Sequence, residues 1–189
     1  MSLQEEVKKA VQVLKDGGVI LYPTDTIWGI GCDATNAEAV KRVYDLKQRE
    51  DSKSMLVLVE NAAMIDRYVS EVPDIAWDLI EAATNPLTII YSGAKNLAPN
   101  LIASDGSVGI RVTSEEFSKQ LIFHFRKPVV STSANISGKP SPRCFDEISE
   151  EILNAVDFVV DFRREETDNP APSSIIKLEP GGVFKIIRP

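Results

Sequence analysis

The chain is poor in the residues that build metal sites and disulfides. Its 189 residues include a single histidine, His124, and two cysteines, Cys32 and Cys144. Two thiols and one imidazole do not make a convincing zinc site, and without an export signal a structural disulfide is not expected. We therefore expect both cysteines to be reduced and packed within the fold, as free cysteines often are.

Long apolar runs and an excess of basic residues are also lacking. No run approaches the roughly 20 apolar residues of a membrane helix, and the acidic N-terminus does not have the basic-then-apolar order of a signal peptide. Both features predict a cytoplasmic protein with no membrane association. The formal net charge of −7 argues against wrapping nucleic acid by counterion release. Any contact with tRNA or double-stranded RNA would need a local basic patch.

The familiar nucleotide-binding and hydrolase motifs are absent. The sequence contains no Gly-x-x-x-x-Gly-Lys-Ser/Thr loop, no Gly-x-Gly-x-x-Gly and no Gly-x-Ser-x-Gly elbow. His124 stands between Phe123 and Phe125 and fits a helix-surface or packing residue better than a catalytic base. If ATP binds, it must bind through another architecture.

Apolar periodicity predicts an α/β fold in one domain spanning residues 1–189. Apolar stripes at helical spacing predict helices over residues 5–15, 37–46, 73–83, 114–125 and 145–155. Short apolar runs predict strands over residues 19–22, 55–59, 88–91, 108–112, 128–130, 158–160, 174–178 and 183–187. Because helices and strands alternate early while strands crowd the end, we expect a mixed sheet with helices packed on it.

Four polar segments adjoin apolar strands, whose ends are where ligands usually lie in α/β sheets. They are residues 23–29 (Pro-Thr-Asp-Thr-Ile-Trp-Gly), 47–55 (around Lys-Gln-Arg), 106–111 (Gly-Ser-Val-Gly-Ile-Arg) and 131–142 (Ser-Thr-Ser-Ala-Asn-Ile-Ser-Gly and beyond). Each has an ordinary structural interpretation, respectively a capped turn, a solvated helix end, a strand end and a polar loop. The functional interpretation is anion binding by hydroxyls, amides and cations, with Arg111 able to hold a carboxylate bidentately.

The order of the four segments resembles the YrdC-like family across nearly the whole chain. The shared pattern is Pro-Thr-Asp-Thr-x-x-Gly, Lys-x-Arg, Val-Gly-Ile-Arg and then Ser-x-Ser-Ala-Asn-x-Ser-Gly. Residues 172–176 and the near-terminal Ile187-Arg188 also fall where that family has matching elements. The resemblance implies the short, single-domain form of the family, with a twisted, mostly open mixed sheet, flanking helices and a deep positive cleft.

The resemblance also implies an activity. L-Threonine, bicarbonate and ATP, the last accompanied by Mg²⁺, would give threonylcarbamoyl-AMP and pyrophosphate. Partner proteins would then move the threonylcarbamoyl group onto the adenosine beside the tRNA anticodon. By the same resemblance, threonine would be held at Thr26, Arg111, Ser131 and Ser173. ATP would be held at Lys47, Arg49, Lys53, Ser107, Ser133, Asn135, Ser141 and Arg188, with Lys47 and Arg49 supplying the catalytic positive charge; no protein side chain is assigned to a metal.

The sequence departs from the family pattern at several positions. Glu50 and Ser54 stand where many relatives have proline, and Val112-Thr113 follow Arg111 where proline is usual. The family's tryptophan-proline-glycine entry to the Pro-Leu-Thr strand reads Thr84-Asn85-Pro86-Leu87-Thr88 here. A histidine that contacts threonine in longer members would fall near Leu58 and is absent.

Two other functions remain open from the sequence. One is a non-catalytic double-stranded RNA or tRNA-binding module of the same fold, against which the intact Ser133-Ala134-Asn135 and the negative net charge argue. The other is a nucleotide-dependent carbamoyl or acyl transferase acting on a different amino acid. Serine, for instance, differs from threonine by one methyl, which a pocket discriminates only by roughly 10–200-fold.

Overall fold

The computed structural model describes residues 2–48, 55–167, 171–179 and 183–189. Its helices are α1 (Leu3–Lys15), α2 (Ala37–Lys47), α3 (Asp74–Ala82), α4 (Glu116–Phe125) and α5 (Glu150–Ala155), with short 3₁₀ turns η1 (Ala62–Arg67), η2 (Pro99–Leu101) and η3 (Phe145–Glu147). Its strands are β1 (Ile20–Tyr22), β2 (Gly29–Gly31), β3 (Leu56–Val59), β4 (Leu87–Tyr91), β5 (Val108–Val112), β6 (Val129–Ser133), β7 (Phe158–Val159), β8 (Ser174–Leu178) and β9 (Phe184–Arg188). None of these helices has the length and apolar character needed to cross a membrane.

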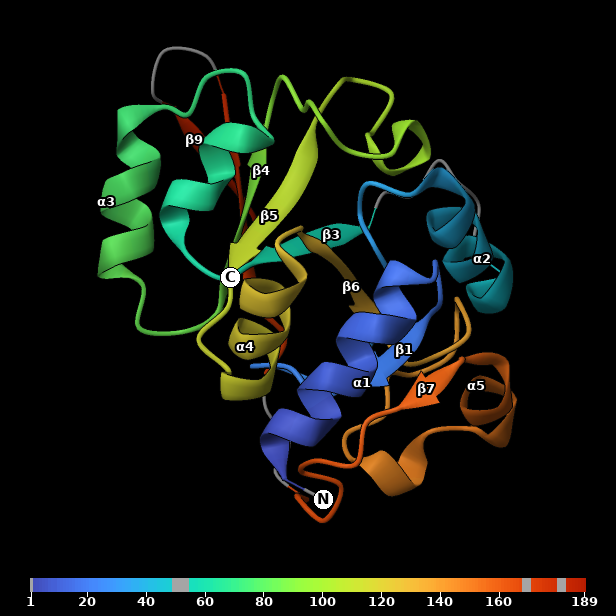
Figure 1. Cartoon of the computed structure of the whole chain (residues 1–189). Coiled ribbons are helices and arrows are strands. Elements are labelled where there is room, and N and C mark those ends of the chain that lie inside the picture. The colour runs from blue at the N-terminus through green and yellow to red at the C-terminus, as the bar shows by residue number, and fades with distance from the viewer. Residues whose placement is uncertain (1, 49–54, 168–170, 180–182) are drawn as a thin grey trace.

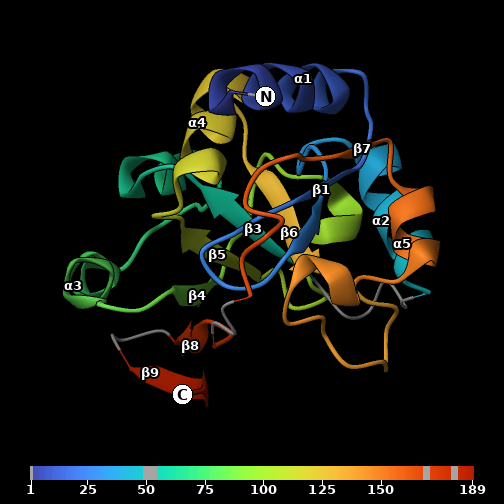
Figure 2. The same cartoon turned by 90° about the horizontal axis from the view of Figure 1, so that it is seen from below.

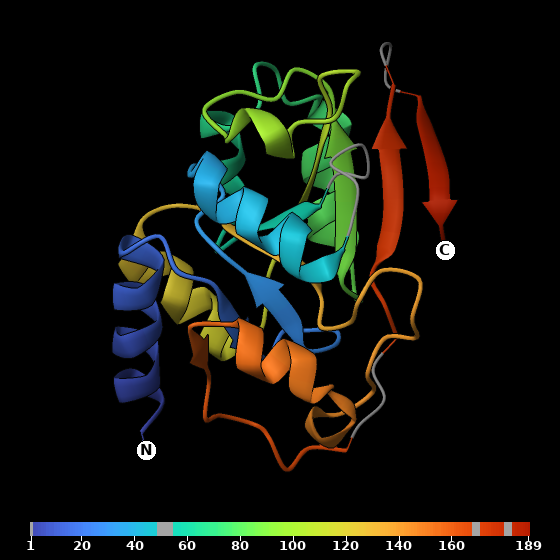
Figure 3. The ribbon, with the colours of Figure 1, turned by 90° about the vertical axis from the view of Figure 1, so that its right-hand side faces the viewer.

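The strands join in one mixed sheet in the order β7-β1-β2-β6-β3-β5-β4-β8-β9. The pairs β1–β7, β3–β5 and β4–β8 are parallel, and the other five neighbouring pairs are antiparallel. Helices α1 and α4 pack together on one side, and the β8–β9 hairpin stands at the opposite margin of the molecule (Figures 1, 2 and 3). The predicted mixed α/β sheet with flanking helices is confirmed.

Helix α1 illustrates how the sequence sets an element. Ser2 and Glu5 form a capping box at its N-terminus, and its apolar face, which includes Val7 and Leu14, is buried. The chain leaves the helix at Gly17, whose φ of +78° is accessible to glycine at little cost. The predicted helix over 5–15 is confirmed, with its start moved to the capping residue.

Three features differ from the predicted elements. Strand β2 (Gly29–Gly31) was not predicted, because glycine has low strand propensity. The predicted helix over 145–155 is divided into η3 and α5, since Ile148 and Ser149 have extended backbone angles. Segments η1 and η2 were not predicted as helical.

Candidate functional site

A pocket of about 340 Å³ opens over one face of the sheet, bordered by the β1–β2 turn. Eight of the side chains that the sequence assigned to ligands line it, namely Thr26, Ser107, Arg111, Ser131, Ser133, Ser141, Ser173 and Arg188. Other lining residues are apolar or small, including Trp28, Leu56, Ile90 and Ile175. The structure therefore brings together residues that lie as far as 162 positions apart in the chain.

Strand register explains why these residues meet. Thr88 on β4 is paired with Arg111 on β5 and with Ile175 on β8, and Ile175 is in turn paired with Arg188 on β9. Side chains of paired residues project from the same face of a sheet. Arg111, Thr88, Ile175 and Arg188 therefore form one row across four strands, and all four line the pocket.

The β1–β2 turn supplies the opposite border. Thr24 Oγ1 accepts the Thr26 N–H at 3.1 Å and donates to the Ile27 carbonyl at 2.7 Å, so the turn is held by its own hydroxyl. At Gly29, a Cβ would lie 3.2 Å from Thr24 Cγ2 and 3.3 Å from Ser131 Oγ. The glycine thus allows the turn to approach β6 closely and brings Thr26 to the pocket.

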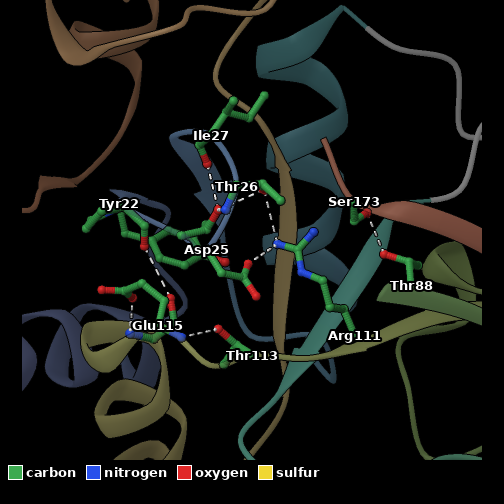
Figure 4. Close-up of polar contacts among 12 residues, drawn as sticks. Tyr22, Asp25, Thr26, Ile27, Thr88, Arg111, Thr113, Glu115 and Ser173 are labelled. Carbon is green, nitrogen blue, oxygen red and sulfur yellow. Dashed lines mark hydrogen bonds and ion pairs between the residues drawn. The ribbon is translucent and has the colours of Figure 1, made fainter. Parts of the chain in front are cut away.

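Arg111 is almost wholly buried and is already paired. Its side chain is 3% exposed, and Nη2 lies 2.9 Å from Oδ1 of Asp25, which is 6% exposed (Figure 4). Nη2 also donates to Thr26 Oγ1 at 3.4 Å, whereas the buried Nε has no hydrogen-bond partner among the described residues. Asp25 was not predicted as a site residue, although it stands inside the Pro-Thr-Asp-Thr segment.

A second polar group joins β4, β8 and β9. Thr88 Oγ1 and Ser173 Oγ lie 2.8 Å apart (Figure 4). Arg188 donates from Nε to the Ser173 carbonyl at 2.8 Å and from Nη2 to Ser173 Oγ at 3.3 Å. Partial burial, followed by the nearby charge of Arg111, lowers the pKa of Arg188. The two guanidinium groups therefore act on the same pocket and favour an anionic ligand.

Lys47, which the resemblance assigns to ATP, is buried and hydrogen-bonded to backbone carbonyls. It is 1% exposed, and its Nζ donates to the carbonyls of Ser133 at 2.5 Å and Asn135 at 2.7 Å. Asn135 donates from Nδ2 to the Lys139 carbonyl at 2.7 Å and accepts at Oδ1 from Ser133 Oγ. Neither Lys47 nor Asn135 lines the pocket. A buried ammonium must be hydrogen-bonded, and these carbonyls satisfy it, so Lys47 shapes the Ser133–Asn135 loop.

Ser107 also lines the pocket and is hydrogen-bonded to Asp105. Its N–H and Oγ both donate to Asp105 Oδ1, at 3.1 and 2.5 Å, and Lys177 Nζ donates to Oδ2 at 2.9 Å. These bonds, the one from Ser107 Oγ first, lower the pKa of Asp105 to about 2. Asp105 therefore remains ionised at neutral pH and fixes the serine.

Several sequence predictions fall outside the pocket. Arg49, Lys53 and the departures Glu50 and Ser54 lie outside the described residues. Leu58 is fully buried and is the register partner of Arg111, and it is not among the residues that line the pocket.

Neither His124 nor either cysteine is among the residues that line the pocket. His124 is exposed on α4 beside the Phe123 ring. Both cysteines are free, Cys32 being buried and Cys144 half-buried. Among the described residues, no three His, Cys, Asp or Glu side chains gather to hold a metal.

Two residues at the site, Thr88 and Asp25, were not predicted, and the sequence indicates only the second of them. Thr88 opens an apolar strand and gives no sign of function until pairing places it beside Arg111. Asp25 could have been found from its position between two threonines that the resemblance already marked, since a buried arginine needs a counter-charge.

Comparison with known proteins gives the same assignment along nearly the whole chain. The sequence family Sua5/YciO/YrdC, described as "Telomere recombination", matches residues 12–189. A "Putative threonylcarbamoyl-AMP synthase" of Methanocaldococcus jannaschii is 37% identical over 188 residues, covering 97% of this chain and 87% of the relative. A "Threonylcarbamoyl-AMP synthase" of Pseudoalteromonas translucida is 33% identical over 188 residues, covering 98% of this chain and all of the relative.

Solved structures share the fold. The crystal structure of P. abyssi Sua5 complexed with L-threonine superposes with a TM-score of 0.86 at 24% identity. The match covers 97% of this chain but only 54% of the length of that Sua5. By its sequence and its fold, this chain belongs to the Sua5/YciO/YrdC family.

Proposed function

We propose that this protein is a threonylcarbamoyl-AMP synthase, which converts L-threonine, bicarbonate and ATP into threonylcarbamoyl-AMP and pyrophosphate. The observation that carries the proposal is the row of Arg111, Thr88 and Arg188 in one pocket with the hydroxyls of Ser131 and Ser173. Such a set recognises a carboxylate and phosphates together. The proposal is also supported by the two relatives described above, both of which are named as threonylcarbamoyl-AMP synthases.

Arg111 is the proposed anchor for the threonine carboxylate. Its Nε is buried without a partner among the described residues, so a carboxylate would satisfy a donor that is otherwise costly to bury. Asp25 holds the other side of the guanidinium, and Thr26, Ser131 and Ser173 supply nearby hydroxyls. The amine of the bound threonine then remains free to combine with bicarbonate, forming a carbamate and releasing water.

ATP would occupy the part of the pocket lined by Ser107, Ser133, Ser141 and Arg188. There the carbamate oxygen attacks the α-phosphate and pyrophosphate leaves, so the main contribution of the protein is positioning and charge stabilisation. Mg²⁺ is proposed to arrive on the triphosphate and to neutralise part of its charge. Arg49 and Lys53 remain proposed phosphate contacts, whereas Lys47 and Asn135 act by shaping the loop that carries Ser133.

The product is a reactive mixed anhydride, so other proteins are proposed to receive it and to carry the threonylcarbamoyl group to tRNA. We also propose that this activity takes place in the cytoplasm, where free threonine, ATP and tRNA are present. Direct binding of tRNA or double-stranded RNA is a separate proposal and is not needed for the reaction.

Pyrophosphate release tests the proposal. The purified protein is supplied with ATP, Mg²⁺ and bicarbonate, with and without L-threonine, and we expect release only with both threonine and bicarbonate. Replacing Arg188 by methionine should lower kcat/KM on the order of 10²-fold, because a charged donor to the reacting phosphates is lost. Lys185→Met, on the same strand but outside the pocket, is the matched control and should leave the rate unchanged.

The opposite outcome is equally informative. Absence of threonine-dependent release, beside a relative that is active in the same assay, would refute the synthase. If tRNA then bound tightly with a steep salt dependence, the non-catalytic binding module would replace it. Faster release of pyrophosphate with L-serine than with L-threonine would show that the substrate is a different amino acid.

A further inference from the structure

Thr88 lies in the pocket between the two arginines that line it. It is the register partner of Arg111 on β5 and of Ile175 on β8, and Ile175 in turn pairs with Arg188 on β9. The side chain is 2% exposed, and the sequence motifs assign it to no ligand. A hydroxyl buried this deeply needs a hydrogen-bond partner, and the partner of Thr88 is a residue of the site.

The backbone brings Thr88 and Ser173 together. Strands β4 and β8 are parallel, with Thr88 opposite Ile175, and the Ser174 N–H donates to the Pro86 carbonyl at 3.0 Å. Ser173 stands one position before β8 and lines the pocket, as does Ile175 two positions later. Thr88 Oγ1 and Ser173 Oγ therefore meet at 2.8 Å (Figure 4).

The methyl group of Thr88 fixes the direction of its hydroxyl. A Cβ added at Gly109 would lie 3.3 Å from Thr88 Cγ2, so the methyl is directed at β5. The hydroxyl is directed at Ser173, which adjoins the strand on the other side of β4. Because a β-branched side chain is restricted at χ1, a methyl packed on one side holds the hydroxyl in place on the other.

The hydroxyl of Ser173 has three hydrogen-bonding positions, and its neighbours account for two of them. A serine hydroxyl has one hydrogen to donate and two lone pairs to accept. Arg188 can only donate, and its Nη2 lies 3.3 Å from Ser173 Oγ, where it occupies one lone pair. A carboxylate oxygen of a bound ligand can only accept, so it takes the hydrogen of Ser173. The remaining lone pair then accepts from Thr88 Oγ1.

Thr88 thereby determines the direction in which Ser173 donates. With Arg188 and Thr88 on its two lone pairs, Ser173 can offer a ligand only its hydrogen. A ligand that presents an N–H at this position finds no acceptor there. Without the Thr88 hydroxyl, one lone pair of Ser173 is free, and the serine can accept from such a donor.

We propose that Thr88 is a positioning residue, which commits the Ser173 hydroxyl to donating to an acceptor oxygen of the ligand. That oxygen belongs to the carboxylate of L-threonine, an identification that rests on the proposed function. The hydrogen bond between Thr88 and Ser173 exists in the protein without the ligand. Thr88 acts on the ligand through Ser173.

Thr88→Val tests this role, because valine has the shape and strand propensity of threonine but no hydroxyl. Binding of L-threonine is measured by calorimetry, and we expect its dissociation constant to rise about threefold to tenfold. Thr88→Ser keeps the hydroxyl and should bind threonine within about twofold of the parent. The matched control is Thr35→Val, which removes a hydroxyl bonded to Asp33 outside the pocket and should bind threonine as the parent does. Thermal unfolding checks that each variant is folded.

L-Threoninamide separates positioning from packing. Its amide presents an N–H where threonine presents only acceptor oxygens, so the parent should bind it more weakly than threonine. In Thr88→Val, a free lone pair of Ser173 accepts that N–H, and the ratio of the two dissociation constants should fall about threefold or more. A loss of packing alone would weaken both ligands alike. An unchanged ratio would therefore overturn the proposal.

Pyrophosphate release distinguishes this inference from the proposed function. The contact with the carboxylate is made in the bound substrate as well as in the transition state, so Thr88→Val should raise KM for threonine with a much smaller change in kcat. If the parent is an active synthase and Thr88→Val keeps its KM, the role of Thr88 is refuted and the synthase stands. If Thr88→Val weakens threonine binding but the parent releases no pyrophosphate, the synthase fails and the role of Thr88 stands. A parent protein that neither binds threonine nor releases pyrophosphate would overturn both.

Discussion

Removing either partner of the Asp25–Arg111 ion pair is expected to destabilise the protein strongly. The two groups are 6% and 3% exposed with 2.9 Å between charged atoms. At an effective dielectric constant of about 20, their Coulomb attraction is about 6 kcal/mol before desolvation is subtracted. Breaking a buried pair by removing one partner typically costs about 3–5 kcal/mol, because the other charge remains buried and uncompensated. For a chain of this length, that corresponds to a fall in Tm of about 6–20 °C.

A double-mutant cycle separates the pair from its surroundings. Asp25→Asn and Arg111→Met are made singly and together, and the free energy of unfolding is measured by urea denaturation. We expect each single variant to lose about 3–5 kcal/mol and the double variant to lose less than the sum, because no unpaired charge is left. The coupling energy should reach about 2 kcal/mol or more.

Threonine binding should differ between the two single variants. Arg111→Met removes the proposed carboxylate anchor, so threonine binding should be lost even at low temperature, where the variant is folded. Asp25→Asn leaves the guanidinium in place and less neutralised, so threonine affinity should be kept or raised in the folded fraction. Additive losses of stability, or threonine binding that survives in Arg111→Met, would refute this account of the pair.

Three further changes test other parts of the site. Lys47→Met should lower the free energy of unfolding by about 2–3 kcal/mol in urea titrations, since the carbonyls of the Ser133–Asn135 loop lose their buried donor. Because the pKa of Asp105 is lowered to about 2, its contribution is present above the unfolded pKa near 4 and is lost as pH falls through 2. Between pH 4 and 2, the free energy of unfolding should therefore fall less in Asp105→Asn than in the parent protein. At this exposed position the difference should be under about 1 kcal/mol, as measured by acid titration of unfolding. Gly31→Ala should lower Tm by several degrees in thermal unfolding, since its Cβ would lie 2.6 Å from Tyr22 Cε1 and from the Val130 carbonyl.

Much of the fold could be predicted from apolar patterning. The run over 108–112 is strand β5 to the residue, and the runs near 19–22 and 174–178 are strands β1 and β8. These segments are buried or half-buried, so hydrophobicity and strand propensity agree. Strand β2 shows the limit, because Gly-Ile-Gly is a strand only through its neighbours. Tyr22 and Val130 leave no room for a Cβ at Gly31, so tertiary packing overrides propensity there.

The sequence motifs predict which residues lie near the site, but they do not predict which atoms each side chain contacts. Thr26, Ser131 and Ser173, which the resemblance assigns to threonine, line the pocket. Lys47 belongs to an equally clear motif, yet its ammonium is held by backbone carbonyls. A sequence records that a cation is present but not which oxygens surround it. That depends on the path of the Ser133–Asn135 loop, which is set by contacts distant in the chain.

Because side chains alternate along a strand, substitutions at neighbouring positions affect opposite faces of the sheet. Arg111 lines the first pocket, whereas its neighbours Ile110 and Val112 on the same strand line a second cavity on the opposite face of the sheet. A change of volume at Ile110 therefore alters the second cavity without adding or removing an atom in the first. The exception is Asp25, which enters from the β1–β2 turn rather than from the sheet and is not bound by the alternation. Asp25 both pairs with Arg111 and lines the cavity on the opposite face of the sheet, so a change at Asp25 alters the surroundings of both.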